Sequence, residues 1–299
     1  MAISIYPVTP TFAAEIGDID LSVPMNAADV QAIKDAFAKY AVLIFPDQHL
    51  SEDQHLDFAG LFGPLDTSIG AYRKEAPLRL SKELTDVSNL DPANEIWGKE
   101  SRRRFFQLGA RLWHTDNSFK RVPARVSLLY ARSIAPVGGH TEFADERAAY
   151  DALPAEMKLR LESLVAEHSI FTSRARLGFS DFSEEERIAM PPVPQAVVRT
   201  IPETGRKSLY LASHAGRIFG MPDDEGCALI DGLIAHATQR RFVYTHRWRV
   251  HDLVMWDDRC TMHHGTEFDD LRWKRDLQRA TVSDIANSCE QEGVAPRAA

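Results

Sequence analysis

Short strand-like segments are spread along almost the whole chain, and this feature restricts the fold more than any other. The clearest segments are Val42–Phe45, Arg125–Ala131, Leu209–Ala212, Arg241–Arg249 and Leu253–Trp256. No glycine-rich loop follows a strand in a way that would hold a phosphate group, which excludes a Rossmann or P-loop fold. The pattern therefore predicts a mainly β protein built as a mostly antiparallel double sheet.

Helical patterns are concentrated near the start of the chain and in insertions between strands. Residues 29–40 carry apolar side chains at helical spacing, and Ser51-Glu52-Asp53-Gln54 is typical of a capping box that opens a helix through Leu61. Two further helices are expected over residues 154–165 and 222–237. They would lie at the periphery of the sheets, which gives an α+β protein with a mainly β core.

Charge and composition exclude several classes of partner. The 299 residues have a net charge of −8, with acidic and basic residues interspersed. The one basic run, Arg102-Arg103-Arg104, is interpreted as a short surface turn or charged rim, so no nucleic acid is expected as a partner. The apolar runs are too short to cross a bilayer, so no membrane association is expected. Three cysteines without a disulfide-like spacing fit a cytoplasmic protein.

The composition changes only near the C-terminus. The residues from 288 to 299 are mostly small or polar, and termini of that kind are commonly poorly ordered. We therefore expect one domain over residues 1–287 and a flexible tail over residues 288–299.

The segment Trp113-His114-Thr115-Asp116 is the first candidate for chemistry. On an extended strand, residues two apart face the same side, so His114 and Asp116 would present an imidazole and a carboxylate to one metal ion. Taken alone, such a pair is weak evidence, because it is more often a surface contact than a metal site. His263 follows an apolar strand far downstream, and two histidines with one carboxylate are the ligand set of non-haem iron(II) oxygenases.

The segment from Arg272 to Thr281 contains the second candidate. Its alternation of charged and apolar residues predicts a strand, which places Arg275 and Arg279 on the same face. A buried guanidinium can bind a carboxylate through two parallel hydrogen bonds. Taken alone, this segment is better explained as a charged edge strand, which is common.

These segments together resemble the taurine dioxygenase and 2,4-dichlorophenoxyacetate dioxygenase family of Fe(II)/2-oxoglutarate-dependent oxygenases. The resemblance extends over nearly the whole chain and is most similar to the 2,4-dichlorophenoxyacetate branch. The motifs that carry it are Phe45-Pro46-Asp47-Gln48, Phe62-Gly63-Pro64-Leu65, Asp86-Val87-Ser88-Asn89, His114-Thr115-Asp116, Gly138-Gly139-His140-Thr141-Glu142-Phe143, the segment from Asp145 to Pro154, His236-Ala237-Thr238-Gln239-Arg240 and Arg279-Ala280-Thr281.

The resemblance implies a distorted double-stranded β-helix, a jelly-roll-like sandwich with iron between its sheets. By position, the iron ligands would be His114, Asp116 and His263. Thr141 and Arg275 would bind the distal carboxylate of the co-substrate 2-oxoglutarate.

Three further positions are implied to bind the substrate. Arg279 would face its acid group, His214 matches a histidine of the 2,4-dichlorophenoxyacetate branch, and Asn89 resembles a substrate-side asparagine of the taurine branch. Two residues depart from the family pattern, since Asp258 stands where asparagine is usual and His264 where arginine often follows the distal histidine.

The implied activity uses Fe(II), 2-oxoglutarate and O₂ to hydroxylate a small organic acid. For an aryloxyacetate, hydroxylation beside the ether oxygen would give a phenol and glyoxylate, with succinate and CO₂ as co-products. The alternatives are a sulfonate or alkyl sulfate dioxygenase with the same iron site, or a non-catalytic metal-binding module. A homo-oligomer is expected.

Overall fold

The computed structural model describes residues 3–68 and 78–298. Its largest sheet has seven strands in the order β1-β2-β3-β13-β5-β15-β4. Neighbouring strands are antiparallel except β2 and β3, which run parallel. In sheet order, the strands are β1 (Ser4–Pro7), β2 (Ala13–Gly17), β3 (Val42–Phe45), β13 (Leu253–Asp257), β5 (Ala124–Ser133), β15 (Asp276–Ser283) and β4 (Leu84–Ser88).

A three-stranded sheet packs against one face of the large sheet. Its order is β12 (Val243–His246), β6 (Thr141–Asp145) and β14 (Thr261–Gly265). Phe143 of β6 lies 5.3 Å from Trp256 of β13, measured between ring centroids, and both side chains are fully buried. The two sheets form the jelly-roll sandwich that was predicted, and their facing apolar side chains fill its interior.

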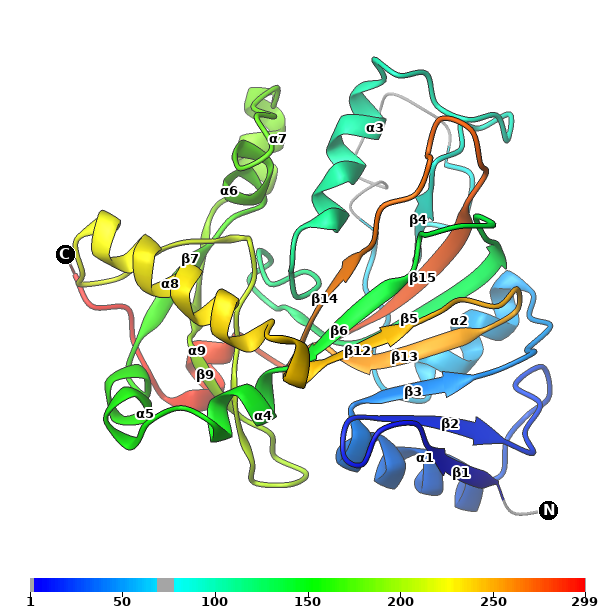
Figure 1. The fold of residues 1–299 in the computed structure, drawn as a ribbon, viewed down its shortest axis with the longest axis horizontal. Coiled ribbons are helices and arrows are strands. Elements are labelled where there is room, and N and C mark those ends of the chain that lie inside the picture. The colour runs from blue at the N-terminus through cyan, green and yellow to red at the C-terminus, as the bar shows by residue number, and fades with distance from the viewer. Residues whose placement is uncertain (1–2, 69–77, 299) are drawn as a thin grey trace.

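The opposite face of the large sheet is covered by α1 (Ala27–Tyr40) and α2 (Glu52–Gly60), which contribute Ile33, Phe37 and Phe58 to a second apolar cluster. Both helices were predicted to within two residues, including the Ser51–Gln54 capping box. Figure 1 shows these helices on the side of the molecule that also holds the N-terminus.

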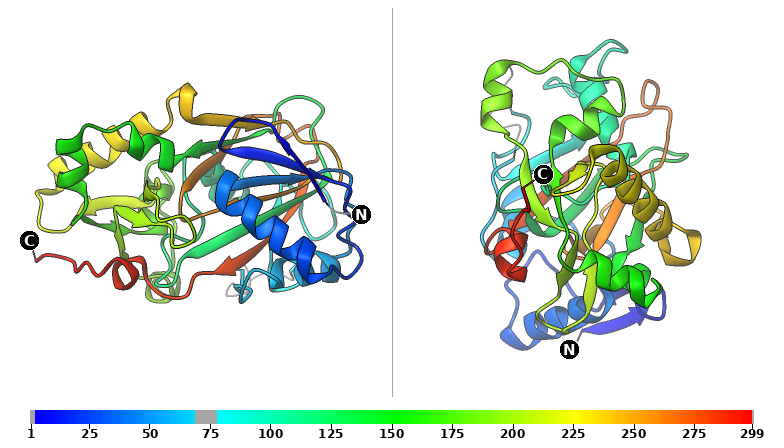
Figure 2. Two further views of the ribbon diagram at one scale, coloured as in Figure 1. Left: turned by 90° about the horizontal axis from the view of Figure 1, so that it is seen from below. Right: turned by 90° about the vertical axis from the view of Figure 1, so that its left-hand side faces the viewer.

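The remaining elements build a second lobe beside the sandwich, and the two termini lie at opposite ends of the molecule (Figure 2). Its helices are α4 (Glu146–Asp151), α5 (Ala155–Leu161), α6 (Ile170–Ala175), α7 (Glu184–Ala189), α8 (Asp223–Ala237) and α9 (Ser288–Glu292). Its strands are β7 (Val165–His168), β8 (Val193–Ala196), β9 (Val198–Thr200), β10 (Lys207–Leu209) and β11 (Ala215–Ile218). The lobe is continuous with the sandwich through one apolar cluster that includes Ala144 of β6 and Met262 of β14.

Several expected boundaries were wrong. The tail was expected to be flexible from residue 288, but Ser288 and Cys289 are buried in α9, and the Ser288 hydroxyl donates to Gln195. The basic run at residues 102–104 is not a turn but the start of α3 (Arg102–Gln107), which continues into the 3₁₀-helix η2 (Leu108–Arg111). The strand expected over residues 209–212 ends at Leu209, and β12 covers only the middle of the range 241–249, after the 3₁₀-helix η3 (Arg240–Phe242).

Among the described residues, no helix combines the length and apolar character needed to cross a membrane.

Candidate metal centre and active site

His114 and His263 are joined through their backbones, although they are far apart in the sequence. They form an isolated antiparallel bridge in which the His114 amide donates to the His263 carbonyl at 3.0 Å and the reverse bond measures 2.8 Å. His263 belongs to β14. The strand expected through His114 and Asp116 was wrong, because the extended backbone is limited to this one bridge and a turn begins at Asp116.

The three expected metal ligands converge despite this difference. His114, Asp116 and His263 each offer a ligand atom, and these atoms lie within 4.8 Å of one another. Nε2 of His114 lies 3.7 Å from Oδ1 of Asp116, and Nε2 of His263 lies 3.7 Å from Oδ2. Ligand atoms held at about 2.1 Å from one ion are roughly 3 to 4 Å apart, so the observed spacing fits a single first-row metal ion.

Hydrogen bonds fix the orientation of His114 and Asp116. The His114 Nδ1 donates to the Leu112 carbonyl at 2.7 Å, which leaves Nε2 with the lone pair that a metal requires. The Ser127 hydroxyl donates to Asp116 Oδ2 at 2.9 Å, and the Asp116 amide donates to Oδ1 of Asp258 at 3.2 Å. The ligand carboxylate and its backbone are thus both held by neighbouring groups.

The charge states of the ligands also suit a metal. Burial lowers the pKa of both His114 and His263 below the ordinary value, although the Asp116 carboxylate acts in the opposite direction. Burial also opposes ionisation of Asp116, but Arg279 and the two histidines outweigh it and lower the Asp116 pKa. Neutral imidazoles and an ionised carboxylate are the forms that bind a metal ion.

His264 points away from this cluster. Its Nε2 lies 3.1 Å from Oε2 of Glu142, and its ring centroid lies 4.2 Å from that of Trp113. Adjacent side chains on β14 face opposite sides, so only one of the two histidines reaches Asp116. The structure places His263 there, in the register that the sequence predicted.

The two arginines of the β15 segment differ in their contacts. Arg279 donates to Oδ1 of Asp116 at 2.5 Å, so its guanidinium lies directly beside the metal cluster. Arg275 precedes β15 and donates from Nε to the Gly139 carbonyl at 3.1 Å. A side chain at Gly139 would lie 3.2 Å from the Arg275 Cδ and Nε atoms, so glycine leaves room for the arginine to pack against the backbone.

The region around Gly139 also contains Thr141. The Thr141 hydroxyl is buried and accepts a hydrogen bond from Trp248 Nε1 at 3.0 Å, which directs its own proton elsewhere. Burial lowers the pKa of Arg275 to about 10, so the guanidinium remains cationic at neutral pH. Arg275 therefore contacts the short segment of the chain that also contains Thr141.

Asn89, expected from the sequence to contact the substrate, lines the cavity and also holds the loop beside it. Its amide nitrogen donates to the carbonyls of Asp270 and Trp273, both at 2.8 Å, and its oxygen accepts from the Arg275 amide. These bonds use both amide hydrogens. Asn89 therefore anchors the loop that leads to Arg275.

A cavity of about 510 Å³ opens beside the cluster of His114, Asp116 and His263, and His214 is one of its lining residues. The His214 ring is 6.0 Å from that of His114 and 4.9 Å from that of Phe119, measured between centroids. Its Nδ1 is 2.9 Å from the Ser173 hydroxyl. His214 is thus placed at the cavity wall beside the metal cluster, where the sequence predicted a substrate residue.

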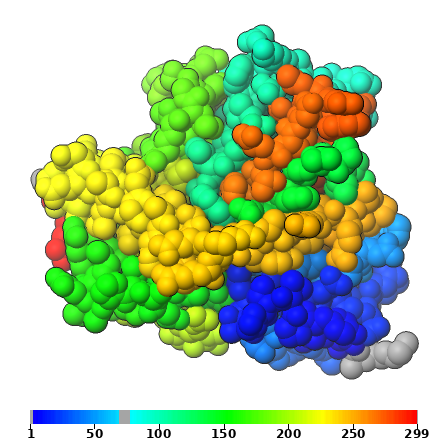
Figure 3. Space-filling model, in the orientation of Figure 1, coloured from blue at the N-terminus to red at the C-terminus, as the bar shows by residue number. Residues whose placement is uncertain are grey.

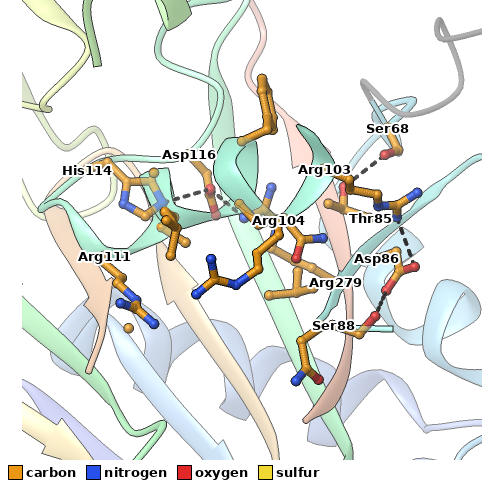
Figure 4. A pocket seen from close by; sticks show the side chains of 18 of the residues that line it. Ser68, Thr85, Asp86, Ser88, Arg103, Arg104, Arg111, His114, Asp116 and Arg279 are labelled. Carbon is orange, nitrogen blue, oxygen red and sulfur yellow. Dashed lines mark hydrogen bonds and ion pairs between the residues drawn. The ribbon is translucent and has the colours of Figure 1, made fainter. Parts of the chain in front are cut away.

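Arginines line much of the same cavity. Figure 4 shows Arg104 and Arg111 on the side of His114, and Arg103 beside Asp86. Arg103 forms an ion pair with Asp86 at 3.0 Å, and Arg104 forms one with Asp270 at 2.9 Å. The basic run that the sequence showed is thus part of the cavity wall, with its charges matched by carboxylates that are distant in the sequence.

Two residues at the site were given no role from the sequence. Asp258 was noted only as a departure from the family pattern, whereas it accepts from the amide of the candidate metal ligand Asp116 and from Trp256 Nε1. Arg174 lines the cavity from α6. Its local sequence, Ser173-Arg174-Ala175-Arg176, gives no sign of which arginine faces inward.

Comparison with known proteins accounts for this arrangement. The family described as "Taurine catabolism dioxygenase TauD, TfdA family" matches residues 4–281. The chain belongs to this family. It is therefore a dioxygenase, and the resemblance seen in the sequence motifs is confirmed.

Individual relatives match over almost their full length. The chain is 44% identical to the alpha-ketoglutarate-dependent 2,4-dichlorophenoxyacetate dioxygenase of Cupriavidus pinatubonensis, over 96% of this chain and 99% of the relative. It is 36% identical to the (S)-phenoxypropionate/alpha-ketoglutarate-dioxygenase of Sphingobium herbicidovorans, over 90% and 91% of the two chains. Among solved structures, AAD-2 in complex with Mn(II) and N-oxalylglycine superposes with a TM-score of 0.88 at 44% identity, over 96% and 99% of the two chains.

Proposed function

We propose that this dioxygenase uses Fe(II), 2-oxoglutarate and O₂ to cleave the ether bond of an aryloxyacetate. The observation that carries the proposal is the convergence of His114, Asp116 and His263 within 4.8 Å beside the arginine-lined cavity. The relatives named for 2,4-dichlorophenoxyacetate and phenoxypropionate support the substrate class.

The metal and co-substrate would be held by separate parts of the site. His114, Asp116 and His263 would bind Fe(II), leaving open positions for other ligands. Arg275 and Thr141 would bind the distal carboxylate of 2-oxoglutarate through a guanidinium and a hydroxyl. When bound, the iron and 2-oxoglutarate supply the O₂ chemistry that oxidises a substrate carbon.

The protein's own contribution is orientation. The substrate's acid group would lie between the wall that carries His214 and the strand that carries Arg279, which turns the adjacent carbon toward the metal. Placement of that carbon to about an ångström decides whether it reacts. Hydroxylation there gives a hemiacetal, whose collapse releases a phenol and glyoxylate, with succinate and CO₂ formed from the co-substrate.

The test measures phenol and succinate together. Protein loaded with Fe(II), ascorbate and 2-oxoglutarate is supplied with phenoxyacetate, 2,4-dichlorophenoxyacetate, taurine or an alkyl sulfate. We expect phenol from the aryloxyacetates in a ratio near one to succinate. Succinate coupled to taurine or alkyl sulfate, with no phenol from any aryloxyacetate, would move the function to the sulfonate or sulfate ester class.

Asp116→Ala is the inactive control for this assay. Removing the one carboxylate of the cluster should abolish phenol formation and metal-dependent succinate release. Circular dichroism of the same variant shows whether the sandwich is intact. The homo-oligomer and the cytoplasmic location remain predictions.

A further inference from the structure

The side chains on the inner face of the three-stranded sheet are aligned across its strands. Thr141 on β6 is paired with Gly265 on β14 and with His246 on β12. Two residues further along β6, Phe143 is paired with His263. Paired residues share a face, as do residues two apart on one strand, so Thr141 lies on the same side of the sheet as the candidate metal ligand His263. In Figure 3 the segments that contain the three strands lie side by side, in gold, green and orange.

Two groups at the start of β6 have donor hydrogens that no described residue accepts. The Thr141 hydroxyl is buried and accepts from Trp248 Nε1 at 3.0 Å, but its own proton has no acceptor within the described part of the chain. Arg275 donates from Nε to the Gly139 carbonyl and forms no ion pair with a described residue. Gly265, which is paired with Thr141, lines the cavity together with Arg275. A hydroxyl and a guanidinium placed in this way fit the carboxylate of a ligand.

The Trp248 indole that contacts Thr141 is itself held in one orientation. Its ring is 4.6 Å from that of His246, measured between centroids, and the two planes are 88° apart. Nε2 of His246 lies 3.0 Å from Oδ2 of Asp252, which is fully buried and also accepts from the Arg249 amide at 3.0 Å. An edge-to-face contact of this kind restricts rotation of the indole. The indole N–H group is therefore kept pointing at Thr141.

The bond from Trp248 decides which role the Thr141 hydroxyl can take. A hydroxyl has one proton and two lone pairs, whereas an indole N–H group can only donate. The indole therefore occupies one lone pair of Oγ1 and leaves the proton for a second partner. Hydrogen bonds in series also polarise one another, so the bond that Oγ1 accepts strengthens the bond that it donates. Without the indole N–H group, the direction of the hydroxyl proton would no longer be fixed.

We propose that Trp248 is a positioning residue, which orients the Thr141 hydroxyl as a donor to the distal carboxylate of 2-oxoglutarate. This inference rests on the proposed function, which assigns that carboxylate to Thr141 and Arg275. Arg275 supplies the positive charge, whereas Trp248 acts through Thr141 and is not one of the cavity's lining residues. Loss of the indole N–H group should therefore weaken recognition of the carboxylate, and it should do so only while the Thr141 hydroxyl is present.

The experiment compares 2-oxoglutarate with 2-oxovalerate, in which a methyl group replaces the distal carboxylate. Both affinities are measured by calorimetry on protein loaded with Mn(II) in place of Fe(II), so that no turnover takes place. The ratio of the two affinities measures recognition of the distal carboxylate. The parent protein should bind 2-oxoglutarate at least about tenfold more tightly than 2-oxovalerate, as expected for hydrogen bonds to a charged group.

Single substitutions test each partner of the Trp248–Thr141 bond. Trp248→Phe keeps an aromatic ring but removes the donor, so it should lower the ratio about fivefold while changing the affinity for 2-oxovalerate by less than about twofold. Thr141→Val should lower the ratio at least as much, and Thr141→Ser, which keeps the hydroxyl, should retain most of it. Trp273→Phe is the matched control, because it makes the same change at an exposed position and should leave the ratio unaltered.

The double variant Trp248→Phe/Thr141→Val shows whether Trp248 acts through Thr141. If it does, adding Trp248→Phe to Thr141→Val should change the ratio by less than about twofold, because the effects of two residues in one hydrogen-bonded pair are not additive. The inference is overturned if Trp248→Phe lowers the ratio equally with and without the hydroxyl. It is also overturned if Trp248→Phe weakens both ligands to the same extent, since that result indicates a purely structural role.

The remaining outcomes separate this inference from the proposed function. If Trp248→Phe does not fold, His246→Leu is the second test, because it keeps the indole N–H group but removes the ring that holds it. His246→Leu should also lower the ratio, and an unaltered ratio overturns the inference. If the parent prefers 2-oxoglutarate and Trp248→Phe keeps that preference, the inference fails and the proposed function stands. If the parent does not distinguish the two ligands, the proposed co-substrate site fails, and the inference fails with it.

Discussion

The backbone bridge between His114 and His263 sets the geometry of the metal centre before any metal binds. Two amide–carbonyl bonds join these residues in both directions. Both imidazoles are therefore attached to one rigid pair rather than to two independent loops. Asp116 lies two residues after His114, at the start of a turn, and is the third residue of the cluster. A centre built in this way loses little conformational entropy when an ion is bound, because its ligands are already in place.

Substitution of two neighbouring histidines on β14 should have different effects on metal binding, because their side chains face opposite sides. His263→Gln should lower Mn(II) affinity at least about tenfold, because it removes a metal-facing nitrogen. His264→Gln should leave the affinity within about threefold, because His264 contacts Glu142 instead. Calorimetric titration of both variants with Mn(II) makes the comparison. Metal loss in His264→Gln with retention in His263→Gln would show that the register of β14 is shifted by one residue.

Arg275 is expected to control co-substrate binding. Arg275→Gln should raise the KM for 2-oxoglutarate by about tenfold or more, because hydrogen bonds to charged groups contribute about 1.5–3 kcal/mol. Arg272→Gln provides the control, since Arg272 is an exposed neighbour on the same loop. Initial rates of succinate formation at varied 2-oxoglutarate concentration give the KM of each variant and of the parent. An unchanged KM in Arg275→Gln would remove this residue from the co-substrate site.

The elements that sequence patterns predicted well are those decided by local chemistry. The Ser51–Gln54 capping box fixes the start of α2, and the apolar run Val42–Phe45 is a buried strand of the large sheet. The three clustered residues His114, Asp116 and His263 were also predicted, through residue types and family motifs rather than through backbone prediction. The extended conformation assigned to His114–Asp116 was wrong, because a turn begins at Asp116, where Ser127 and Asp258 from distant segments form hydrogen bonds with the residue.

The features that sequence reasoning missed depend on contacts between distant segments. Arg103 was interpreted as a surface residue because nothing near it in the chain shows that Asp86 lies beside it. The C-terminal helix α9 was missed because its short, polar sequence is stabilised by burial of Ser288 against Gln195. Nothing in the sequence around Arg174 indicates that it lines the cavity, because its side chain packs against Gly109, which is distant in the sequence.

Asp258 is expected to position the metal ligand Asp116. Asparagine at this position offers the same oxygen to the Asp116 amide and to Trp256 Nε1, so Asp258→Asn should keep Mn(II) affinity within about threefold. Asp258→Ala removes the acceptor and should weaken binding by about tenfold or more, as commonly found for groups that orient metal ligands. Equal affinities in the alanine and asparagine variants would show that the Asp258 oxygen does not position Asp116.

The last prediction concerns the dependence of stability on pH. His55 is fully buried in α2, its Nε2 donates to the Leu128 carbonyl, and its Nδ1 accepts from Gln278. Burial lowers the pKa of His55 to about 4, although the Leu128 bond acts in the opposite direction. The unfolded chain, with an ordinary histidine pKa of about 6.5, takes up a proton first as the pH falls. The stability that depends on neutral His55 is therefore complete above about pH 6.5 and is lost toward pH 4.

At pH 5 this difference corresponds to a loss of about 2 kcal/mol from His55 alone, taking about 1.4 kcal/mol for each pH unit below 6.5. His55→Gln cannot titrate, so its free energy of unfolding should fall less between pH 7 and pH 5 than that of the parent, even though it starts lower. His49→Gln serves as the control, because the His49 side chain is 68% exposed. Urea unfolding of the three proteins at both pH values gives the comparison. If His55→Gln and the parent lose the same free energy over this range, another group must account for the acid sensitivity of the fold.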